Sequence, residues 1–103
     1  MEKRIARSLI VELLEQGCSL SVYDGGETTL KDSVNRMDIL YSLATTDEDY
    51  LFVKDSSGKK LGWYKFMYGE TGYDVICDHS MTLENMYPKT ADLIRKLEGK
   101  VPA

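Results

Sequence analysis

Cysteine and histidine are scarce in this chain, which has two cysteines, Cys18 and Cys77, and a single histidine, His79. Two cysteines are too few for the disulfide framework of a small secreted domain. They are also too few, with one histidine, for an ordinary structural zinc site, and no close-spaced pair of ligands anchors one. We therefore expect reduced thiols, no metal and no cofactor, in a cytoplasmic protein.

Basic residues are outnumbered, 13 Lys and Arg against 17 Asp and Glu, which gives a formal net charge of −4. Proteins that hold nucleic acid by its phosphates normally carry a basic excess, so this balance argues against general nucleic-acid binding. Long apolar runs are missing too. The run over 9–11 is interrupted by Glu12, so neither a signal peptide nor a membrane span is predicted.

The length predicts one domain over residues 1–103, with a frayed tail at 100–103. Helical spacing of apolar residues indicates three helices, over 3–16, 33–45 and about 88–98. In the first helix, Glu12 is expected on the solvent side. Asp32 and Ser33 are candidate N-caps of the second. Its expected core-facing residues are Val34, Met37, Leu40, Tyr41, Leu43 and Ala44.

Alternation of apolar and polar residues predicts the strands. Segment 18–23 reads as a half-buried strand, and the pair Gly25-Gly26 suits the two-residue loop of a hairpin whose return strand is 28–31. An acidic turn over 45–49 follows the second helix. Three β-prone runs joined by short turns then form a meander over 50–54, 61–68 and 73–78.

The resulting order, α-β-β-α-β-β-β-α, predicts an α+β protein. We expect a two-layer sandwich in which helices cover one face of a mainly antiparallel sheet. The C-terminal helix is expected to pack on that sheet.

Cys77 and His79 are the one place where a nucleophile and an imidazole come close in the sequence. On a regular strand they share a face, but their Cβ atoms stand roughly 6–7 Å apart. Asp78 points to the other side and cannot orient the imidazole ring, as a catalytic pair requires. We predict that the chain is not an enzyme, and catalysis by Cys77 and His79 is the weakest of the alternatives.

The segment 59–68 interleaves lysines with aromatic residues. Either Trp63 and Met67 or Tyr64 and Phe66 must face the helices. The other pair then meets solvent, a partner or a second copy of the chain, which would make a homodimer.

Aromatic residues among lysines are typical of surfaces on which single-stranded nucleic acid stacks, and this is an alternative function. Its candidate residues are Lys54, Lys59, Lys60, Lys65, Trp63 and Tyr64.

Distinct strand and turn signals occur at Ser21-Val22-Tyr23-Asp24-Gly25, Thr46-Asp47-Glu48-Asp49, Gly62-Trp63 and Tyr68-Gly69. In these stretches the chain resembles a group of small uncharacterised proteins encoded by bacteriophages, prophages and other mobile elements of Gram-negative bacteria. The resemblance covers most of the chain. It implies a bacterial host cytoplasm, and it transfers no catalytic or binding residue because the group has no assigned activity.

The leading hypothesis is a non-enzymatic interaction protein, such as a phage-encoded modulator or inhibitor of a host protein. The expected partner is a host protein with a basic surface, which an acidic edge and exposed aromatic side chains would contact. The candidate binding residues are Tyr23, Asp24, Glu27, Asp47, Glu48, Asp49, Trp63 and Tyr64.

Overall fold

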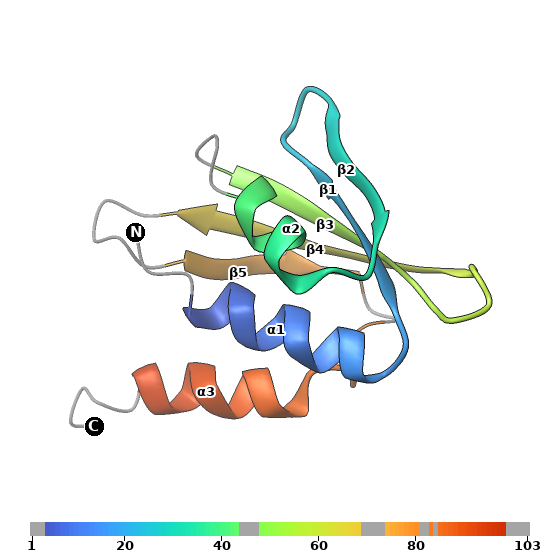
Figure 1. The fold of residues 1–103 in the computed structure, drawn as a ribbon. Coiled ribbons are helices and arrows are strands. Elements are labelled where there is room, and N and C mark those ends of the chain that lie inside the picture. The colour runs from blue at the N-terminus through green and yellow to red at the C-terminus, as the bar shows by residue number, and fades with distance from the viewer. Residues whose placement is uncertain (1–3, 44–47, 69–73, 81–82, 84, 99–103) are drawn as a thin grey trace.

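The computed structural model describes residues 4–43, 48–68, 74–80, 83 and 85–98. Its elements are α1 (Arg4–Glu15), β1 (Ser19–Tyr23), β2 (Thr28–Ser33), α2 (Arg36–Ser42), β3 (Glu48–Lys54), β4 (Lys60–Tyr68), β5 (Asp74–His79) and α3 (Pro88–Glu98). The strands form one antiparallel sheet in the order β2-β1-β3-β4-β5 (Figure 1). The predicted α+β class and element order are confirmed. Among the described residues, no helix has the length and apolar character to cross a membrane.

The sheet has an inner face that is packed against helices and an outer face opposite it. Alternation along β1, β3 and β4 turns fully buried side chains inward, where they meet apolar residues of α1 and α2 in one core. The inner-face core residues are Leu20, Val22, Leu51, Val53, Tyr64 and Phe66. Hence β4 buries Tyr64 and Phe66 and leaves Trp63 and Met67 on the outer face, the second of the two predicted arrangements.

Helix α2 is shorter than the predicted span 33–45, and its buried side differs from the expected one. Its N-cap is Asn35, whose side chain accepts the backbone N–H of Asp38. Ile39 is buried, whereas Val34, Met37 and Tyr41 are exposed. The prediction for these three residues is therefore wrong, because Val34 precedes the helix and the short helix turns only one side to the sheet. Ala44 lies outside the described residues.

The predicted N-caps of this helix instead belong to the end of β2, which extends to Ser33. Asp32 lies at a β-bulge and has a positive φ of 50°. In the hairpin before it, the predicted two-residue loop is confirmed, because the backbone N–H of Asp24 donates to the carbonyl of Glu27. Gly25 there has a φ of 96°.

Helix α3 packs mainly against α1, not on the sheet as predicted (Figure 1). The carboxylate of Glu12 joins the two helices: it accepts the backbone N–H groups of Lys89 at 2.8 Å and Thr90 at 2.9 Å. A hydrogen bond of 2.9 Å between the hydroxyls of Ser8 and Thr90 lies beside it. The prediction that Glu12 faces solvent is wrong, since its side chain is buried as the cap of a distant helix.

Gly62 allows β4 to approach the end of β5 closely. An added Cβ there would lie 1.9 Å from the Ser80 hydroxyl oxygen, and φ is 148°. That hydroxyl accepts the backbone N–H of Trp63, while the Ser80 N–H donates to the Trp63 carbonyl. Ser80 thereby holds both backbone polar groups of Trp63.

Candidate functional site

Four aromatic residues of β1, β3 and β4 gather on the outer face. Strand register accounts for this, because Tyr23 lies directly opposite Tyr50, and Phe52 directly opposite Trp63. We call Tyr23, Tyr50, Phe52 and Trp63 the aromatic cluster. Its side chains are half-buried except for Phe52, which is 42% exposed.

The rings of the aromatic cluster support one another. Tyr50 lies at its centre, with ring centroids 6.0 Å from Tyr23, 6.5 Å from Phe52 and 6.1 Å from Trp63. Tyr23 also contacts Phe52 edge-on at 6.2 Å. These tilted, edge-on and stacked arrangements are the favoured ones for aromatic pairs. The cluster is therefore a preorganised surface with little side-chain entropy left to lose on binding.

Lys65 extends the cluster with a cation. Its ammonium group lies 5.6 Å from the centroid of the Tyr50 ring and 3.4 Å from a carboxylate oxygen of Glu48. The hydrogen bond from Lys65 to Glu48, helped by the charge of that carboxylate, raises the pKa of Lys65. Glu48 is thus engaged within the sheet.

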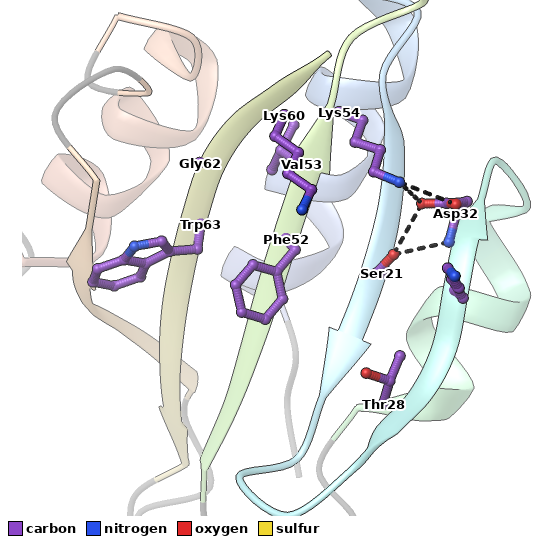
Figure 2. A pocket seen from close by; sticks show the side chains of 10 residues that line it. Ser21, Thr28, Asp32, Phe52, Val53, Lys54, Lys60, Gly62 and Trp63 are labelled. Carbon is purple, nitrogen blue, oxygen red and sulfur yellow. Dashed lines mark hydrogen bonds and ion pairs between the residues drawn. The ribbon is translucent and has the colours of Figure 1, made fainter. Parts of the chain in front are cut away.

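A groove of about 700 Å³ adjoins the aromatic cluster on the outer face (Figure 2). Its lining residues are Ser21, Thr28, Lys31, Asp32, Phe52, Val53, Lys54, Lys60, Gly62 and Trp63. Phe52 and Trp63 supply the aromatic side of this lining. The volume is in the range of small-ligand sites.

The other side of the groove is polar and ordered. Lys54 reaches across β1 to Asp32, 3.0 Å from a carboxylate oxygen, with Ser21 between them (Figure 2). The hydroxyl of Ser21 also accepts the backbone N–H of Asp32 at 2.8 Å. The hydrogen bond from Lys54 is the main cause that lowers the pKa of Asp32, so this carboxylate stays ionised at neutral pH.

Two of the predicted binding residues are buried, which corrects their assignment. Tyr64 points inward, has no exposed surface and donates its hydroxyl to the carbonyl of Leu83 at 3.1 Å. Asp49 lies in β3 and on the inner face, with no exposed surface. The expected acidic turn therefore does not include Glu48 and Asp49, which are strand residues.

The remaining acidic candidates do not form a single acidic edge with Glu48 and Asp49. Asp24 accepts the backbone N–H groups of Gly26 and Glu27, both at 2.8 Å, and these bonds lower its pKa. It thus serves the hairpin turn. Glu27 is exposed there, and Asp47 lies outside the described residues. Of the described candidates, Tyr23 and Trp63 belong to the aromatic cluster, and Glu48 joins it through its ion pair with Lys65.

His79 and Cys18 lie away from this face. The imidazole of His79 packs against Tyr64, with ring centroids 6.0 Å apart, and against Tyr87 at 5.5 Å. The side chain of Cys77 lies outside the described residues. Cys18 is a buried free thiol, and its burial raises its pKa. Within the described part of the chain, no group of three or more His, Cys, Asp or Glu is placed to hold a metal ion.

Among the residues of the site that sequence reasoning missed are Tyr50, Phe52, Lys31 and Asp32. The signal for Phe52 was present, since Leu51 and Val53 flank it and a strand buries only one of its two faces. The sequence carries no such signal for Lys31 and Asp32, because an irregularity in the pairing of β2 places them at the groove. The chain matches no protein-family model, no curated protein and no solved structure.

Proposed function

We propose that this protein is a small binding protein and that the outer face of its sheet is its contact surface. The observation that carries the proposal is the aromatic cluster, which joins four rings on the face opposite the helices. Phe52 and Met67 are 42% and 46% exposed there. Large aromatic residues are enriched where proteins bind their partners.

This proposal does not include the acidic edge expected from the sequence, because Asp49 is buried and Glu48 pairs with Lys65. A partner with a basic surface accordingly has no support from the described residues. The absence of enzymatic activity, the cytoplasmic setting and a phage-encoded role against a host protein stay predictions.

A comparison of variants tests the contact surface. Tagged wild-type protein, Phe52→Ala and Tyr41→Ala would serve as bait in bacterial lysate, with captured protein and captured nucleic acid measured separately. Tyr41 is the matched control, since its ring is 75% exposed on α2. We expect the wild type and Tyr41→Ala to capture the same partner from the lysate, and Phe52→Ala to capture much less of it. Equal capture by Phe52→Ala and the wild type contradicts the proposal.

A further inference from the structure

The groove on the outer face has a charge opposite in sign to that of the whole chain. Lys31, Lys54 and Lys60 line it together with one carboxylate, Asp32. Lys54 pairs with Asp32, whereas Lys31 and Lys60 have no ion pair with any described residue. Three lysines against one carboxylate therefore line the groove of a protein whose net charge is −4. This local excess attracts an anionic ligand.

The aromatic lining adds a second requirement on the ligand. Phe52 is 42% exposed and Trp63 is half-buried, from opposed positions on neighbouring strands. Tyr50 supports both rings from one side, and the Ser80 hydrogen bonds hold the Trp63 backbone. Fixed rings of this kind stack with flat ligand groups.

We propose that this groove binds single-stranded nucleic acid, with bases stacking on Phe52 and Trp63 and phosphates contacting Lys31 and Lys60. The inference rests on the proposed function and names its ligand class. Lysine is depleted in the contact surfaces between proteins, whereas lysines beside exposed aromatic rings characterise surfaces that bind single strands. In a duplex the bases are already stacked on each other, so the rings would have nothing to bind.

The test is a titration of the full chain with labelled oligothymidine and oligouridine of about twelve nucleotides. Trp63 is the sole tryptophan, so its fluorescence reports directly on the groove. We expect quenching of Trp63 and a rise in anisotropy of the label. With two phosphate contacts on a single strand, affinity should fall about sevenfold between about 50 and 200 mM salt.

Matched variants localise the binding. Phe52→Leu should weaken it by roughly 5- to 150-fold, the loss of one stacked base, while Tyr41→Leu leaves it unchanged. Lys60→Ala should weaken it and flatten the salt dependence, while Lys96→Ala, the same charge change on an exposed residue of α3, leaves both unchanged.

Three results would overturn the inference: no binding of either oligonucleotide at about 100 μM protein and low salt, equal affinity for a duplex, or Phe52→Leu and Lys60→Ala binding as wild type. If oligonucleotides do not bind but Phe52→Ala still loses a protein captured from lysate, the ligand class is wrong and the contact surface stands. If Phe52→Ala captures as much from the lysate as the wild type does, the proposed function is wrong as well.

Discussion

Replacing Glu12 by alanine should destabilise the protein, because this buried carboxylate caps a helix that lies 77 residues further along the chain. Pro88 has no N–H, so the first-turn donors that need a partner include those of Lys89 and Thr90, and Glu12 accepts both. Tyr87, which precedes the helix, has no carboxylate or amide side chain to cap it. The N-terminus of α3 is therefore capped by a side chain of α1.

The magnitude follows from the two backbone donors that would lose their acceptor. The N–H of Thr90 is buried and that of Lys89 is partly buried. An unsatisfied buried donor costs about 1–3 kcal/mol, and water can reach the second more easily, so we expect a loss of about 2–4 kcal/mol for Glu12→Ala. Glu12→Gln keeps one acceptor and should lose about half of that.

Urea unfolding at neutral pH, followed by circular dichroism, measures this loss. For an m-value of about 1.5 kcal/mol/M, the midpoint should fall by roughly 1.3–2.7 M. The control is Glu15→Ala, which breaks the exposed ion pair to the Lys89 ammonium, 3.4 Å long, and should cost at most about 1 kcal/mol. A Glu12→Ala protein as stable as Glu15→Ala would refute the reasoning.

Three further predictions concern stability. Gly62→Ala should cost at least about 2 kcal/mol in urea, because the new Cβ collides with the Ser80 hydroxyl at a positive φ; a wild-type midpoint would show that the approach is not tight. Hydrogen bonds from Ser57 and Lys59 lower the pKa of Asp55 below 3.8. The ionised carboxylate therefore stabilises the fold above that pH, and this contribution is lost as the pH falls through the lowered pKa. Asp55→Asn should accordingly reduce the fall in urea midpoint between about pH 7 and pH 2, and an unchanged fall would contradict the assignment. Tyr64→Phe should cost about 1–2 kcal/mol, by removing a buried hydrogen bond, and a loss below 0.5 kcal/mol would count against it.

The parts of the fold that were predictable from sequence are those set by local pattern. Alternation over 18–23 placed Leu20 and Val22 in the core, and Gly25-Gly26 marked the hairpin. In β4, by contrast, both faces carry aromatic residues, so alternation could not decide whether Trp63 or Tyr64 is buried. The deciding factor is the packing of the inner face against the helices.

The buried acidic residues could not be predicted for a different reason. The neighbouring sequence predicts that the acidic side chains of Glu12 and Asp49 are exposed to solvent, yet both are buried. For Glu12 the cause is visible: its hydrogen-bond partners lie on α3, far away in sequence. Contacts of that range leave no trace in the spacing of neighbouring residues. The same holds for the groove, which draws on β1, β2, β3 and β4.

The contact between α1 and α3 also has a consequence for synthesis of the chain in the cell. Glu12 is translated before its two backbone partners, which are added only 77 and 78 residues later. Until then the carboxylate lacks both donors, and burying it without them would cost free energy. We therefore expect the nascent chain to reach its native state only after α3 has left the ribosome, with little stable packing of α1 before that point.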